Sequence, residues 1–142
     1  MKPENQFISN LHKHLDPVIH REKTANPYRR GMPDVYYEAP QGTVLWAEYK
    51  WFDKETVRTI DLAKHITSNQ QAWLRRAHAN AVPVAVVVGC PHRAAILFGD
   101  SWETPQKLSW LPRKQVVGIL HSALLPGGTH ALDNQRTDDY TP

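Results

Sequence analysis

The feature that most constrains the fold is the stretch "GMPDVYYEAPQGTVLWAEYKWF", residues 31–52. It contains two runs rich in β-branched and aromatic residues, 34–38 and 43–52, separated by the turn-forming residues "APQG". This pattern predicts a β-hairpin. Ionisable side chains nevertheless stand inside it: Asp34 opens the first run, and Glu48 and Lys50 lie within the second. Charged groups in a hairpin that builds a core require partners, so their purpose has to be explained.

The register of this hairpin decides where the charges meet. If the turn centres on Gln41, paired residue numbers sum to 82, and Asp34 lies opposite Glu48 with Cβ atoms about 4.5–5.5 Å apart. Two facing carboxylates destabilise a sheet unless a cation neutralises them, and carboxylate oxygens are preferred ligands of Mg²⁺. Strand alternation also places Glu48 and Lys50 on one face and Tyr49 on the other. A slip of one residue would send Asp34 to the opposite face.

The remaining hydrophobic periodicity predicts an α/β fold with a central mixed sheet of four to five strands flanked by helices. The order is α-β-β-β-α-β, followed by an edge strand and a final helix. Residues 53–66 look like a polar excursion, Thr67 or Ser68 caps the second helix, and Pro112 occupies the first turn of the last one. The expected helices are 4–15, 67–80 and 112–125, and the expected strands are 18–23, 34–38, 43–52, 83–89 and 94–99.

Length and composition set the wider frame. A chain of 142 residues supports one domain, which we place at 1–125, with a core at about 4–98, a helical extension at about 104–125 and a flexible tail at 126–142. No apolar run is long enough to span a membrane, and the N-terminus lacks the apolar segment of a signal peptide. The single cysteine, Cys90, excludes an internal disulfide and favours a cytoplasmic location. A net charge of +3 favours a polyanionic partner only weakly.

Two more polar residues occupy positions where apolar ones are expected. Glu4 shares the core-facing stripe of the first helix with Phe7 and Leu11, although an acid there also complements the helix dipole. Gln70 lies in the buried stripe of the second helix, four residues before Leu74. A buried glutamine is costly without a partner, so it is either a satisfied core amide or part of a site.

A basic segment, "HREKTANPYRR" at 20–30, comes directly before the hairpin. It is either a solvated loop or a phosphate-binding surface for nucleic acid. Its four cations are Arg21, Lys23, Arg29 and Arg30.

These residues together resemble a known enzyme signature. Pro33-Asp34 on one strand, followed by Glu48-Tyr49-Lys50 on the next, looks like the motif of the PD-(D/E)XK nucleases. An early helix carrying an acid and a later helix with "SNQQAWL" are similar to the stand-alone VRR-NUC branch. The resemblance spans about residues 4–98. The short motif is weak by itself, whereas the ordered set on the expected elements is much more specific.

The resemblance implies a restriction-endonuclease-like core that binds Mg²⁺, with Mn²⁺ able to substitute. Lys50 would orient or help to deprotonate the attacking water, and Gln70 would position that water or Lys50 itself. The products would carry a 5′ phosphate and a 3′ hydroxyl. The metal ligands that it implies are Asp34, Glu48, Glu4 and the backbone carbonyl of Tyr49.

We therefore expect a metal-dependent endonuclease that hydrolyses DNA phosphodiester bonds. Its substrates would be branched or junction DNA, and it would act as a homodimer in the cytoplasm of a bacterial cell, possibly encoded by a phage. Two alternatives stay open: a sequence-directed nuclease of the homing or restriction type, and an inactive nucleic-acid-binding module of the same fold. The opposed acids argue against the second, since an inactive copy has no reason to retain them. Trp46, on the Glu48 face, and Trp51, on the other, are candidate nucleic-acid contacts.

Overall fold

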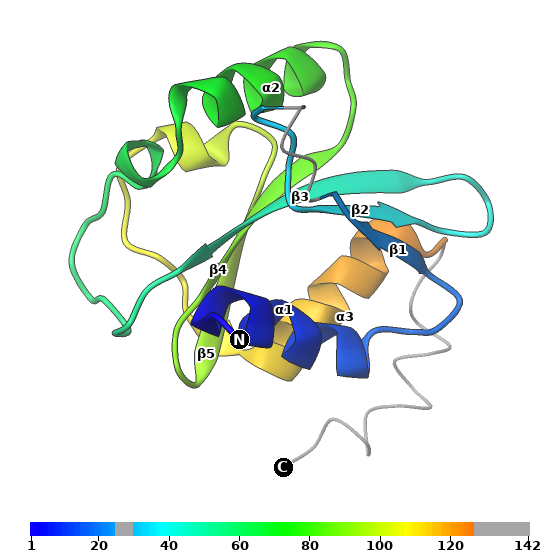
Figure 1. Ribbon diagram of the computed structural model, residues 1–142, viewed down its shortest axis with the longest axis horizontal. Coiled ribbons are helices and arrows are strands. Elements are labelled where there is room, and N and C mark those ends of the chain that lie inside the picture. The colour runs from blue at the N-terminus through cyan, green and yellow to red at the C-terminus, as the bar shows by residue number, and fades with distance from the viewer. Residues whose placement is uncertain (25–29, 127–142) are drawn as a thin grey trace.

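The computed structural model describes residues 1–24 and 30–126, which form a six-stranded sheet between layers of helices (Figure 1). The strands follow one another in sheet order, and β3 and β4 pair in parallel while the other neighbours are antiparallel. The strands are β1 His20–Lys23, β2 Val35–Glu38, β3 Val44–Trp51, β4 Val84–Gly89, β5 Arg93–Phe98 and β6 Leu111–Pro112. The helices are α1 Pro3–His14, α2 Ser68–Ala79 and α3 Arg113–Leu124, with 3₁₀ turns η1 Leu62–His65 and η2 Ser101–Glu103.

The α/β class, the mixed sheet and the α-β-β-β-α-β order are confirmed. The strand count of four to five is wrong, because β6 pairs with β5 and gives a sixth strand. The segment 94–99 was expected at the sheet edge but is covered on that side, with Ala94 paired to Leu111. Two residues are too few for a period-2 pattern, so β6 was not predicted.

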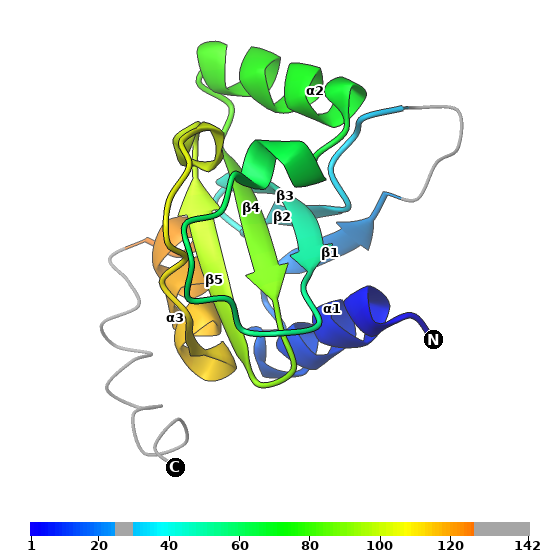
Figure 2. The same ribbon diagram turned by 90° about the vertical axis from the view of Figure 1, so that its left-hand side faces the viewer.

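The sheet has two covered faces, each with its own apolar cluster. Figures 1 and 2 show α1 and α3 on one side and α2 on the other. In the first cluster, Phe7 of α1 and Leu120 of α3 pack with sheet residues such as Tyr49. In the second, Leu74 of α2 packs with sheet residues such as Val86. Strand β4, "VAVVVG", is buried throughout because both of its faces are covered.

Residues beyond the predicted core also contribute to it. Helix α3 supplies Val116, Val117 and Leu120 to the first cluster, so the core extends well past residue 98. The polar excursion at 53–66 contains the fully buried Leu62 and joins the second cluster. The predicted tail, apart from residue 126, lies outside the described residues. Within 1–24 and 30–126, no helix has the length and apolar character needed to cross a membrane.

The hairpin register is confirmed. Strands β2 and β3 pair with residue numbers that sum to 82, from Val35 opposite Ala47 to Glu38 opposite Val44. Gly42 closes the turn with φ 96°, a conformation that favours glycine. The alternation then places Glu48 and Lys50 toward α2 and Tyr49 toward α1, as predicted.

Candidate active site

Asp34 is held at the start of β2 by its own backbone and side chain. Its carbonyl accepts a hydrogen bond from the Thr24 amide at 2.9 Å, and its Oδ2 accepts one from the Tyr49 amide at 2.9 Å. The loop before it passes against α2, where Gly31 has φ 84° and a Cβ would lie 2.4 Å from the Asn69 carbonyl oxygen. A side chain at Gly31 would therefore push this loop away from α2.

The Tyr49 backbone also faces the start of β2. The amide and carbonyl of one strand residue point toward the same neighbouring strand. The pairing of β2 with β3 ends at Val35 and Ala47, and the Tyr49 amide is already bonded to the Asp34 side chain. The Tyr49 carbonyl consequently lies on the side of Asp34, beyond the last paired residues of the β2–β3 ladder.

Glu48 is the most unusual residue of the site. Its side chain is 1% exposed, and its Oε2 pairs with the Lys50 ammonium at 3.2 Å. Its Oε1 is buried without a hydrogen-bond partner among the described residues. Burial, and then the nearby charge of Asp34, raise the pKa of Glu48 to about 8, although Lys50 opposes the shift. A buried acceptor oxygen without a hydrogen-bond partner lowers the free energy of unfolding, unless a bound ligand supplies the partner.

Lys50 and Gln70 are brought together from β3 and α2. The Lys50 ammonium donates to Gln70 Oε1 at 3.2 Å, so this lysine is held between a carboxylate and an amide oxygen. Gln70 Oε1 also accepts a hydrogen bond from the Thr67 backbone N–H at 3.1 Å, and the Gln70 backbone N–H donates to Thr67 Oγ1 at 3.2 Å. This reciprocal capping box fixes the first turn of α2 and, with it, the oxygen that holds Lys50.

Glu4 lies within electrostatic reach of the same residues. Its burial raises the pKa of the Glu4 carboxyl, the charge of Asp34 raises it further, and Lys50 lowers it. The described residues contain no group of three His, Cys, Asp or Glu side chains that is ready to hold a metal ion. The structure thus places Glu4 near the other acids but does not assemble it with them as a third ligand.

The residues present fit a magnesium ion. Two carboxylates and a carbonyl outside the β2–β3 ladder are hard oxygen donors, and one carboxylate oxygen is buried without a partner. Protein sites for Mg²⁺ often use only one or two carboxylates, with waters and substrate phosphate oxygens completing the coordination. Asp34, Glu48 and the Tyr49 carbonyl are the residues that would hold it.

The four basic residues have different surroundings. The Arg21 guanidinium donates to the carbonyls of His12, Asp16 and Ile19 at 2.9–3.1 Å, where it ties β1 to the end of α1. Three of its five N–H donors are therefore used in the fold, and its role in phosphate binding stays a prediction. Lys23 is exposed and 3.4 Å from Asn5 Oδ1, and Arg30 is exposed beside Gly31. Arg29 lies outside the described residues.

Two further residues support the site. Gly31, which opens the "GMPD" segment of the motif, sets the approach of its loop to α2. Thr67 was predicted only as a helix cap. Its second effect, fixing the Gln70 oxygen that holds Lys50, depends on the packing of α2 against β3 and has no sequence signal.

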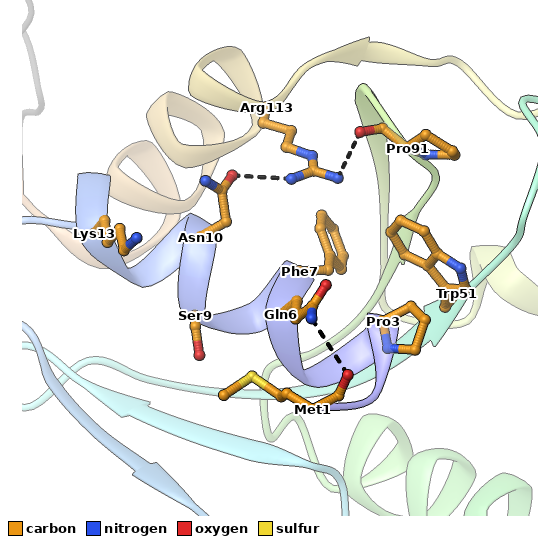
Figure 3. A pocket seen from close by; sticks show the side chains of 10 residues that line it. All are labelled: Met1, Pro3, Gln6, Phe7, Ser9, Asn10, Lys13, Trp51, Pro91 and Arg113. Carbon is orange, nitrogen blue, oxygen red and sulfur yellow. Dashed lines mark hydrogen bonds between the residues drawn. The ribbon is translucent and has the colours of Figure 1, made fainter.

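A pocket of about 590 Å³ lies on the α1 face of the sheet, between α1, β3 and the start of α3 (Figure 3). The Arg113 guanidinium spans it, donating to Asn10 and to the Pro91 carbonyl. None of the acids of the site lines it. Its lining residues are Met1, Pro3, Gln6, Phe7, Ser9, Asn10, Lys13, Trp51, Pro91 and Arg113.

Comparison with known proteins gives one solved structure to report. No protein-family model and no curated protein sequence matches the chain. The chain is similar to the Holliday junction resolvase Hjc of Archaeoglobus fulgidus, with 16% identity and a TM-score of 0.45, over 82% of this chain and 92% of that one. At this level of similarity, function has to be inferred from the residues of this chain.

Proposed function

We propose that this protein is a metal-dependent endonuclease that hydrolyses DNA phosphodiester bonds, with branched or junction DNA as its substrate. One observation carries the proposal: the buried Glu48 carboxyl, close enough to Asp34 for that charge to raise its pKa and paired with Lys50, has an oxygen without a partner among the described residues. A purely structural carboxylate at 1% exposure would be expected to have both oxygens satisfied. Here the missing partner lies where a cation would also offset the charge of Asp34.

Each residue then has a definite task. Asp34, Glu48 and the Tyr49 carbonyl would hold Mg²⁺ or Mn²⁺, which when bound supplies charge stabilisation at the phosphate and a more acidic water. The Lys50 ammonium, fixed between Glu48 and Gln70, would orient the attacking water and offset negative charge that builds up on the phosphate. Glu4 would act through the waters of the site, since its carboxyl interacts electrostatically with Asp34 and Lys50.

Binding of the DNA would use exposed cations near the site. Lys23 and Arg30 stand on either side of the loop that precedes Asp34, and neither is locked to the fold as Arg21 is. We include a homodimer in the proposal, because two active sites would allow two strands of a junction to be cut. A VRR-NUC affiliation, a phage origin and a cytoplasmic location stay predictions.

The test is a cleavage panel of junction, flap, duplex and single-stranded DNA with Mg²⁺, Mn²⁺ or EDTA. The wild type should cleave at least the branched substrates with either metal and nothing in EDTA. Glu48→Gln should lose at least about 100-fold in rate, the usual scale for one electrostatic group of a catalytic site. Glu38→Gln is the matched control, because Glu38 lies on the same hairpin, is exposed, and should leave the rate unchanged.

Other results would select the alternatives. Cleavage in EDTA, or equal rates for Glu48→Gln and wild type, would overturn the metal-site proposal. Cutting of duplex DNA at defined sequences without a preference for branches would favour the sequence-directed nuclease. Binding of the substrates with no cleavage under any condition would favour the inactive binding module.

A further inference from the structure

A row of aromatic side chains continues from the candidate active site along the same face of the sheet. Tyr36 of β2 and Trp46 of β3 have ring centroids 4.7 Å apart, and Trp46 lies 5.1 Å from Trp73 of α2. The Arg76 guanidinium lies over the Trp73 ring at 4.9 Å. Three elements that are separate in sequence thus contribute to one continuous aromatic surface, which we call the aromatic row.

The aromatic row begins next to the acids. Trp46 precedes Glu48 by two residues on one strand face, a separation of about 6.6 Å along the strand. Trp73 follows Gln70 by three residues on α2, about 4.5 Å along the helix axis. The β3–α2 junction therefore carries the Lys50–Gln70 contact at one position and the Trp46–Trp73 contact at another, with Glu48 between them in the β3 sequence.

Packing of α2 accounts for only part of this arrangement. Tyr36, Trp46 and Trp73 are all partly exposed, whereas Trp102 of the same side is fully buried. In the part of the chain that the structure describes, the Trp51 and Trp110 indoles donate to protein oxygens, but those of Trp46 and Trp73 do not. Neither nitrogen is a buried atom without a partner among the described residues, so packing alone does not account for these two indole N–H groups.

We propose that the aromatic row of Tyr36, Trp46 and Trp73, with Arg76 at its end, is a stacking platform for an unpaired nucleobase. The inference rests on the proposed nuclease function and names its substrate class: DNA with unpaired or splayed nucleotides next to the scissile phosphate. Aromatic rings stack on any base, at about 1–3 kcal/mol per base, and arginine adds a cation for the adjoining phosphate. A base in a closed duplex cannot reach the platform without leaving its stack.

Binding is measured in EDTA, so that cleavage plays no part, with short single-stranded DNA and a blunt duplex as probes. Trp73→Leu keeps apolar bulk against the sheet but removes the stacking face. It should weaken single-strand binding by about 5- to 150-fold, the range that corresponds to one stacked base. Trp73→Phe retains an aromatic face and should stay within about threefold of wild type. Phe98→Leu, which removes an exposed aromatic ring from β5, is the matched control and should not change binding.

A second variant covers the case in which Trp73→Leu unfolds. Arg76 is exposed, and among the described residues its guanidinium contacts only the Trp73 ring. Arg76→Gln should therefore leave the core intact. It should weaken single-strand binding about threefold and duplex binding less. Thermal melting of every variant checks that the fold is present.

The outcomes separate the two proposals. Single-strand binding that falls in Trp73→Leu supports the platform even if no DNA is ever cleaved, in which case only the nuclease proposal fails. Single-strand binding that is unchanged in Trp73→Leu and in Arg76→Gln overturns the platform, whether or not the protein cleaves DNA. The aromatic row would then only pack α2 on the sheet.

Discussion

The two faces of strand β3 differ in how completely their polar groups are satisfied. On the α1 side, the Tyr49 hydroxyl contacts the Tyr37 hydroxyl at 2.5 Å, and Tyr37 contacts His12 Nε2 at 2.7 Å. Burial and the charges of Arg21 and Lys23 lower the pKa of His12 to about 4, so this chain of groups is neutral at pH 7. On the α2 side, the ionisable Glu48 and Lys50 of the same strand contact each other, and Glu48 Oε1 is left without a partner among the described residues.

The difference distinguishes a structural polar network from a functional one. A buried network in which each hydroxyl and ring nitrogen has a partner stabilises the fold and needs no ligand. A buried carboxyl group with an unpaired oxygen, near a second acid, destabilises the fold, and a bound cation would remove that destabilisation. We therefore expect changes on the α2 side to affect activity and changes on the α1 side to affect stability.

The largest expected effect is that of Lys50→Ala. Removing the ammonium should slow cleavage by at least about 100-fold, because a positioned electrostatic group at the phosphate is lost. DNA binding should change far less, since the exposed cations remain. Rates and equilibrium binding are measured on one branched substrate at one salt concentration. Lys54→Ala changes an exposed lysine four residues further on and is the control. If Lys50→Ala cleaved at the wild-type rate, the α2 side of β3 would not be the functional face.

The second effect is the pH dependence of stability in EDTA. The folded-state pKa of Glu48 is about 8, above the ordinary value of 4.5, so the native protein retains a proton that the unfolded chain releases. The free energy of unfolding should fall between pH 4.5 and 8, by on the order of 1 kcal/mol per pH unit. Glu48→Gln should remove this slope. Urea unfolding at several pH values measures it, and an equal slope in wild type and Glu48→Gln would contradict the assignment.

A smaller effect is expected for Asp34→Asn. In metal-free buffer above pH 8, where the Glu48 carboxyl is ionised, this change should stabilise the protein by on the order of 1 kcal/mol, because the repulsion between the two acids is relieved while the Tyr49 amide keeps an acceptor. Added Mg²⁺ should stabilise the wild type more than Asp34→Asn. Thermal melting with and without metal tests both statements, and a less stable metal-free Asp34→Asn would show that the acids are not opposed.

The smallest effect is that of Tyr49→Phe on the satisfied face. Tyr37 keeps its bond to His12, so the loss should be about 0.5–1 kcal/mol of stability. Cleavage should remain within about twofold of wild type, although Tyr49 stands between the two charged residues in sequence. Unfolding and cleavage are measured on the same preparation. A rate loss as large as that of Lys50→Ala would mean that the two faces are not functionally separate.

The sequence by itself determined the hairpin and its faces. The turn around Gln41 and the period of two are local properties, so they specified the register of β2 and β3, from Val35 opposite Ala47 to Glu38 opposite Val44, and sent Tyr49 to the face opposite that of Glu48. The same holds for the cap of α2, which the helical pattern predicted at Thr67 or Ser68 and the structure has at Thr67. The pairing of these two strands could therefore be predicted before any tertiary contact was known.

Tertiary structure alone decided how these groups are paired. The sequence predicts a phosphate contact for Arg21, and only the structure shows that three of its donors bind carbonyls of His12 in α1 and of Asp16 and Ile19 in the segment after it. The unpaired oxygen of Glu48, the Gln70 oxygen that holds Lys50, and the sixth strand at Leu111–Pro112 depend on packing between segments far apart in the chain. The spacing of apolar residues shows which face of a helix or strand is buried. Which polar side chains become partners depends on how elements far apart in the sequence pack together.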